Sequence, residues 1–119
     1  MAHKSFHRTD RVSAQLRRDL GTLVHDLVRE GHLPSVSVSD VEVTRDLAHA
    51  KVYVTALDPE QAPKAMATLR EASWEIRREL GKMLRMRHVP ELHFHYDDSV
   101  DRGERIDALL SQLGDPPTD

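Results

Sequence analysis

The residues best suited to bind a ligand lie on one helix, predicted between residues 61 and 85. When that helix is projected at about 100° per residue, five cations fall within about 80° of Trp74, the only tryptophan in the chain. These cations are Arg70, Arg77, Arg78, Lys82 and Arg85. Guanidinium groups bind phosphate through paired hydrogen bonds, and an exposed indole can stack on an unpaired base. The pattern therefore predicts an RNA-binding face.

Other cations extend this candidate face. We expect contributions from four residues near the N-terminus and one beyond the long helix, namely Lys4, Arg8, Arg11, Arg18 and Arg87. An alternative stays open, because Glu71, Glu75 and Glu79 lie on the same helix and could pair with the cations. In that case the face is an ordinary solvated helix surface.

A second candidate site is the pair His93 and His95, which a strand would place about 7 Å apart on one face. Together with Asp97 they could hold a metal ion, and a small metal-dependent hydrolase is the alternative function. No third ligand follows at a recognised spacing, and no nucleophile or glycine-rich phosphate loop accompanies the pair. We therefore expect no catalytic residue, no metal and no cofactor.

Composition narrows the class of protein. The chain has 119 residues, of which 39% are hydrophobic, so we expect one folded domain with an aliphatic core. It has no cysteine and no long apolar run, so we expect a cytoplasmic protein that is neither exported nor membrane-bound. The net charge of −3 is unevenly spread, because residues 1–89 hold 15 basic and 12 acidic side chains, against 2 and 8 in residues 90–119. A third possible function is a protein-interaction module that binds basic partners through this acidic end.

Hydrophobic periodicity predicts the elements that position these residues. They are a helix from about residue 9 to 31, strands over 35–44 and 50–57, a long helix over 61–85, a strand over 91–96 and a short helix over 106–113. The apolar alternation slips by one residue at Asp40, which predicts a β-bulge. A break is expected inside the long helix, where Gly81 is the only glycine. The expected fold is α+β, with helices on one face of a three-stranded sheet and polar side chains on the other.

Four segments of the chain form a distinctive pattern. One is Val-Glu-Val-Thr-Arg-Asp-Leu-Ala-His-Ala-Lys-Val-Tyr-Val over residues 41–54. The others are Leu-Gly-Lys at 80–82, Leu-Arg-Met-Arg-His-Val-Pro-Glu-Leu at 84–92 and Phe-His-Tyr-Asp-Asp-Ser at 94–99. In these segments the chain resembles the bacterial ribosome-binding factor A family, and the resemblance spans roughly residues 5–113.

The resemblance implies a KH-like domain of type II (α-β-β-α-α-β) topology over residues 1–113, with a disordered acidic tail over 114–119. It also implies a non-enzymatic assembly factor that binds 16S rRNA in the immature 30S subunit and supports maturation of that RNA, including processing of its 5′ end. We expect a cytoplasmic monomer with no small-molecule substrate and no membrane partner.

The chain departs from the family pattern at one place. The family usually bends its long helix at an Ala-X-Gly triplet, which corresponds here to Ala72, Ser73 and Trp74. Because tryptophan does not adopt a positive φ cheaply, the bend either lies at Ser73–Trp74 or the helix runs through to Gly81.

Overall fold

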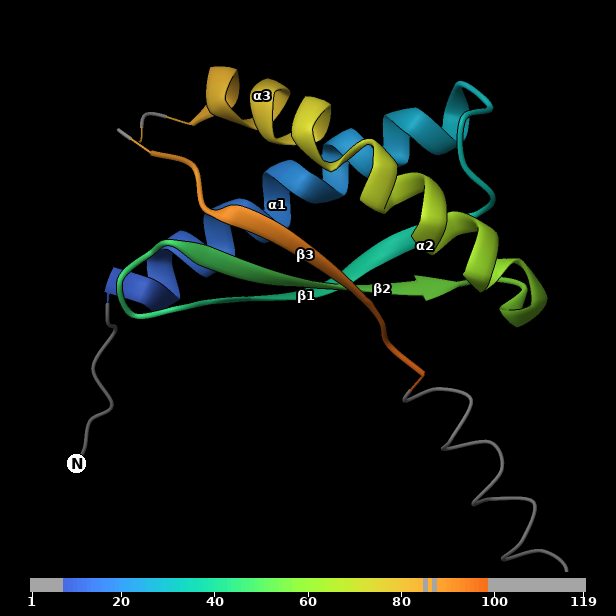
Figure 1. Cartoon of the computed structure of the whole chain (residues 1–119), viewed down its shortest axis with the longest axis horizontal. Helices are drawn as coiled ribbons and strands as arrows, with labels where there is room; N and C mark the ends of the chain where they lie inside the picture. The colour runs from blue at the N-terminus through green and yellow to red at the C-terminus, as the bar shows by residue number, and fades with distance from the viewer. Residues whose placement is uncertain (1–7, 85, 87, 99–119) are drawn as a thin grey trace, which may run out of the picture.

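A computed structural model describes residues 8–84, 86 and 88–98. Its elements are α1 (Arg8–Arg29), β1 (Val36–Val43), β2 (His49–Ala56), a 3-10 turn η1 (Pro59–Gln61), α2 (Ala62–Glu71), α3 (Ser73–Met83) and β3 (Glu91–Tyr96). Figure 1 shows the three helices on one side of the sheet, which confirms the α+β layout predicted from periodicity. The expected helix over 106–113 and the tail over 114–119 lie outside the described residues.

The sheet has the order β1-β2-β3, with β1 and β2 antiparallel and β2 and β3 parallel. The register between β1 and β2 shifts between Val38 and Asp40, so Ser39 is the extra residue of a bulge. This confirms the bulge that the apolar alternation predicted. It lets Val36 and Val41, an odd number of residues apart, both point into the core.

The core lies between the helices and the sheet and is aliphatic, as the composition predicted. The largest fully buried side chains come from α1, β2, α2, α3 and the segment before β3, and they are Leu16, Leu20, Val24, Val52, Val54, Leu69, Leu80 and Pro90. Phe94 of β3 also lies in the core and is the one buried aromatic residue of the part of the chain that the structure describes. No described helix is both long enough and apolar enough to span a membrane.

The long helix bends at Ala72, between α2 and α3, one residue before the expected Ser73–Trp74 position, and it does not bend at Gly81, which lies inside α3. Ala72 has φ −90° and ψ 4°, a conformation open to any L-residue, so the bend needs no glycine. The Ala72 N–H still donates to the Thr68 carbonyl, and the Ala72 carbonyl accepts from Ile76. The bend therefore puts Trp74 into the first turn of α3 without strain.

The turn between β1 and β2 is held by the side chain of Asp46. Its carboxylate accepts hydrogen bonds from the Thr44 hydroxyl at 2.7 Å and from the Ala48 N–H at 3.0 Å. These bonds hold the pKa of Asp46 below its ordinary value, with the Thr44 bond the larger cause. The position in this turn with a positive φ, 62°, is occupied by Leu47. Because glycine usually takes such a conformation, the sequence carried no glycine signal for the turn.

Candidate nucleic-acid interface

Trp74 projects into solvent from the first turn of α3. Its side chain is 65% exposed, although indoles are normally well buried. The Arg78 guanidinium lies over the ring, 5.2 Å from its centroid. This is cation–π geometry between residues one helical turn apart. The outward position of the indole, predicted from helical spacing, is confirmed.

Arg70 and Arg77 lie on the same side of the bent helix but contact the backbone. Arg77 donates from Nε and Nη2 to the Val89 carbonyl, at 3.1 and 2.7 Å. Arg70 donates to the Phe94 carbonyl at 3.0 Å and thereby covers the open edge of β3. A carbonyl satisfies donors without cancelling the positive charge, so both arginines still raise the local potential.

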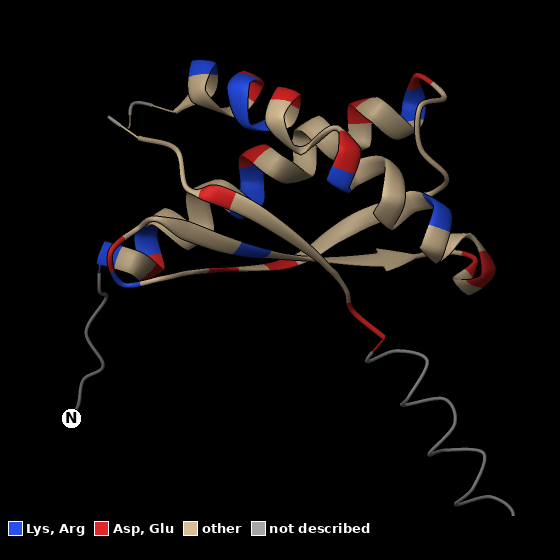
Figure 2. Ribbon diagram, in the orientation of Figure 1, with Lys and Arg blue, Asp and Glu red and all other residues tan. Residues whose placement is uncertain are grey.

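Acidic and basic residues alternate along α3, as Figure 2 shows. Among the described residues of this helix one ion pair forms, between Lys82 and Glu79 at 3.2 Å, and both side chains are exposed. No described cation pairs with Glu71 or Glu75. Among the described cations of this face, the alternative of a face neutralised by its own glutamates therefore holds for Lys82 only.

The cations expected near the chain start lie on or before α1. Arg11 lines a shallow groove with Met83 and Leu84, which places it beside the C-terminal end of α3. Arg8 and Arg18 are exposed on α1, and Arg18 donates to the Gln15 side chain at 2.7 Å. Three further expected residues, Lys4, Arg85 and Arg87, lie outside the described residues.

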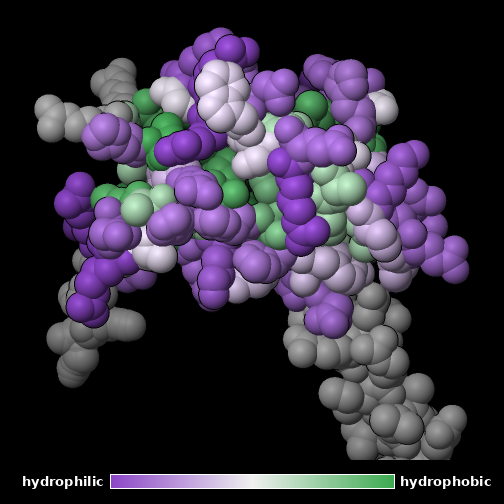
Figure 3. Space-filling model, in the orientation of Figure 1, coloured by the Kyte–Doolittle hydropathy of each residue, from purple (hydrophilic) through white to green (hydrophobic). Residues whose placement is uncertain are grey.

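A groove of about 640 Å³ runs along the open edge of β3 beside the helix bend. Helical residues Arg70 and Ser73 line it, together with Leu92 and Phe94. Its remaining lining residues are polar and come from β2, β3 and the turn before β2, namely Thr44, His49, Lys51, His93 and His95. Figure 3 shows hydrophobic surface at the centre of the viewed face, framed by hydrophilic side chains.

The groove includes residues that sequence reasoning missed. Lys51 and His49 come from β2, and only the parallel register with β3 brings them beside His93. The β-rich segment at residues 50–57 signalled a strand, but nothing local signalled which strand would lie next to it. A pairing of residues 44 positions apart is set by the fold of the whole chain.

The metal cluster considered for the alternative hydrolase is not assembled. The His95 ring lies against Tyr53, with ring centroids 5.7 Å apart, and the Asp97 carboxylate accepts a hydrogen bond from Ser39 at 2.8 Å. His93 instead lies beside His49 and Glu91. The reason is geometric, because residues facing each other on neighbouring strands are closer than alternate residues along one strand.

Comparison with known proteins identifies relatives over almost the whole chain. The sequence model of the family described as ribosome-binding factor A matches residues 8–110. The ribosome-binding factor A of Stenotrophomonas maltophilia strain K279a is 68% identical over 112 residues, which cover 94% of this chain and 88% of the relative.

Solved structures agree with the sequence comparison. The crystal structure of ribosome-binding factor A from Thermus thermophilus superposes with a TM-score of 0.67 and 26% identity, covering 76% of this chain and 97% of that one. A Thermus thermophilus homology model, fitted into the cryo-EM map of a complex of this factor with the 30S subunit, gives a TM-score of 0.62 and 29% identity. It covers 72% of this chain and 91% of that one. The fold is KH-like, and the chain belongs to the ribosome-binding factor A family, which is not a known enzyme family.

Proposed function

We propose that this chain is a non-enzymatic assembly factor that binds the free, immature 30S subunit and supports 16S rRNA maturation, including processing of the 5′ end. It acts in the cytoplasm as a monomer. One observation carries the proposal for this chain's own residues, namely the exposed Trp74 with Arg78 over its ring. Family membership and the relative fitted into a 30S complex support the choice of partner.

Trp74 and Arg78 would act together on an unpaired nucleotide. An exposed indole offers a flat surface for a base, and stacking of this kind is worth about 1–3 kcal/mol per base. Arg78 is already ordered over one face of the ring, so its guanidinium loses little freedom when it binds a neighbouring phosphate. Lys82 lies one further turn along α3 and would exchange its exposed ion pair with Glu79 for a phosphate, because exposed ion pairs of this kind are weak.

The groove along β3 would guide the backbone of the same RNA strand. Lys51 and Arg70 carry positive charge at its walls, and no acidic side chain of the described residues lines it. Contacts of this type fix position rather than sequence, because phosphates are alike in every nucleotide. We therefore expect specificity to come from the shape of the RNA and from neighbouring ribosomal proteins.

The test measures how salt affects binding to purified immature 30S subunits. An Arg78→Glu, Lys82→Glu variant should bind more weakly, and the slope of log affinity against log salt should fall by about one for each lost phosphate contact. Arg77 is left intact in this variant, because it also anchors the segment before β3.

Arg29→Glu is the matched control. Arg29 is an exposed arginine at the far end of α1, and the change should leave the salt slope unaltered. Equal affinities and slopes for the parent chain and the double variant would show that this face does not bind RNA. Binding that survives nuclease treatment would favour the third alternative, a protein partner.

A further inference from the structure

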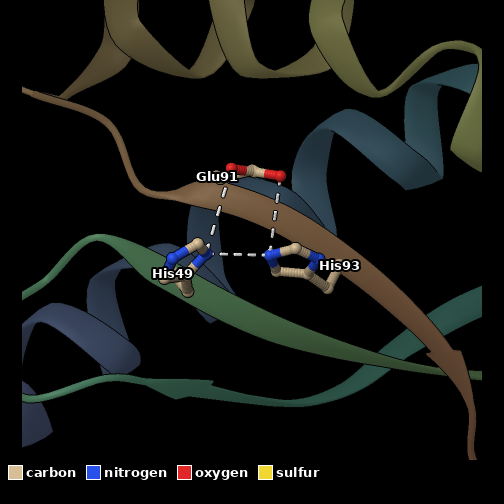
Figure 4. Close-up of side chains that lie close together, drawn as sticks. All are labelled: His49, Glu91 and His93. Atoms are coloured by element: carbon tan, nitrogen blue, oxygen red, sulfur yellow. Dashed lines mark hydrogen bonds and ion pairs between the residues drawn. The ribbon is translucent and has the colours of Figure 1, made fainter.

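Two histidines and a glutamate converge on the polar face of the sheet, at the start of β2 and β3 (Figure 4). His49 Nδ1 lies 3.0 Å from His93 Nε2, and the two oxygens of Glu91 lie 3.9 Å from the former and 3.8 Å from the latter. We name these three residues the imidazole cluster. Among the described residues it is the one group whose ligand atoms could share an ion.

The spacing in the imidazole cluster is close to that of a zinc coordination shell. Tetrahedral geometry with bonds of about 2.0–2.1 Å puts two ligand atoms roughly 3.3 Å apart. The observed separations of 3.0, 3.8 and 3.9 Å lie on both sides of that value. Small side-chain rotations would therefore bring all three groups onto one ion.

The backbone already holds the three ligands in place. The His49 N–H donates to the Thr44 hydroxyl at 3.1 Å, and the His49 carbonyl accepts from the Thr44 N–H at 2.9 Å. The Glu91 N–H donates to the Ala48 carbonyl at 2.8 Å. Because β2 and β3 are in fixed parallel register, an ion would find its ligands largely preorganised.

The chemistry of the donors selects the class of metal. Two imidazoles and one carboxylate suit Zn²⁺ and similar transition metals, whereas Mg²⁺ and Ca²⁺ prefer oxygen ligands alone. All three side chains are partly exposed, so water could complete the shell. Lys51 lies next to His93 on the same side of the sheet, and its positive charge would repel a bound cation. Glu42 lies across from Lys51 on β1 and offsets part of that charge.

We propose that His49, Glu91 and His93 form a binding site for one Zn²⁺ ion that ties β2 to β3. His49 and His93 also line the groove along β3, but the ion site does not depend on the proposed RNA-binding function. The ion would add a link between two paired strands that η1, α2 and α3 separate in sequence, and so would stabilise the folded chain.

Isothermal titration of the chelator-treated full-length protein with Zn²⁺ tests the proposal. We expect one ion per chain, and a rise in Tm of roughly 10 °C when free Zn²⁺ is a hundredfold above Kd. His49→Ala, His93→Ala and the conservative Glu91→Gln should each weaken binding at least tenfold. Mg²⁺ should not bind measurably.

His95→Ala is the matched control, because His95 is an exposed histidine on the same strand and the same face, yet lies against Tyr53. It should leave Zn²⁺ affinity within about twofold. Unchanged affinity in His49→Ala and Glu91→Gln would overturn the site, because the ion would then be held by other histidines of the chain. Equally tight Mg²⁺ binding would also overturn it.

Discussion

The outward side of α3 and the imidazole cluster are both polar surfaces, but they arise in different ways. Trp74 and Arg78 meet because they are four residues apart on one helix. His49 and His93 meet because β2 and β3 pair in parallel, although the two residues are 44 positions apart in sequence. A surface built by local periodicity is therefore visible in a sequence, whereas a surface built by strand register is not.

The same contrast separates two neighbouring arginines. A helical projection places Arg77 and Arg78 on the same side of α3. Arg77 nevertheless donates to the backbone before β3, whereas Arg78 covers the indole. Helical spacing shows which side of the helix a residue occupies. The partner that the residue contacts there depends on which other segment of the chain packs against that side.

The largest effect should come from the buried side of α3, on which both surfaces depend. Leu80 is fully buried, and Leu80→Ala should lower the free energy of unfolding by about 2–5 kcal/mol. Met83→Ala on the same helix, at a residue 43% exposed, should stay within about 0.5 kcal/mol. Urea denaturation followed by circular dichroism measures both. Similar losses would mean that α3 does not pack as described.

A smaller effect should distinguish the two neighbouring arginines. Arg77→Ala removes two charge-assisted hydrogen bonds to the Val89 carbonyl, so we expect a loss of about 1–2 kcal/mol in unfolding free energy. Arg78→Ala, on the exposed side, should cost less than about 0.5 kcal/mol. The same denaturation experiment compares them. Equal losses would contradict the division of roles between anchor and RNA contact.

The smallest effect should come from the turn that leads into His49. The pKa of Asp46 is below its ordinary value of 3.8, so its ionised form favours the folded state. That contribution is complete above about pH 4 and is lost as the pH falls through the lowered pKa. Asp46→Asn should therefore lower Tm slightly at pH 7, and the difference from the parent should shrink at about pH 3. A Tm difference between the variant and the parent chain that grows as the pH falls would contradict the expected direction.

Much of the fold was predictable because its signals are local. The apolar spacing of Leu16, Leu20 and Val24 indicated α1, and the phase slip near Asp40 indicated the bulge. The bend was expected at Ser73–Trp74 or at Gly81, but it lies at Ala72, one residue before the first of these positions, because Ala72 turns the chain without a positive φ. The family resemblance supplied the topology, which composition alone did not.

Less of the candidate site was predictable. Helical projection identified the exposed indole and the cations beside it, but gave no sign that Arg70 and Arg77 contact backbone carbonyls. It also missed Lys51, which reaches the groove only through strand pairing. For the same reason His93 was assigned His95 as its metal-binding partner, although His49 lies closer.

Crosslinking from position 74 tests the central claim most directly. A photoreactive aromatic residue would replace Trp74 in the full-length chain, and irradiation in immature 30S particles would be followed by mapping of the linked nucleotides. The same residue at Leu57, which is 85% exposed, serves as the control. We predict links from position 74 to 16S rRNA at defined nucleotides, with few from position 57. Links from position 74 to ribosomal proteins alone would contradict an RNA-binding role for this face.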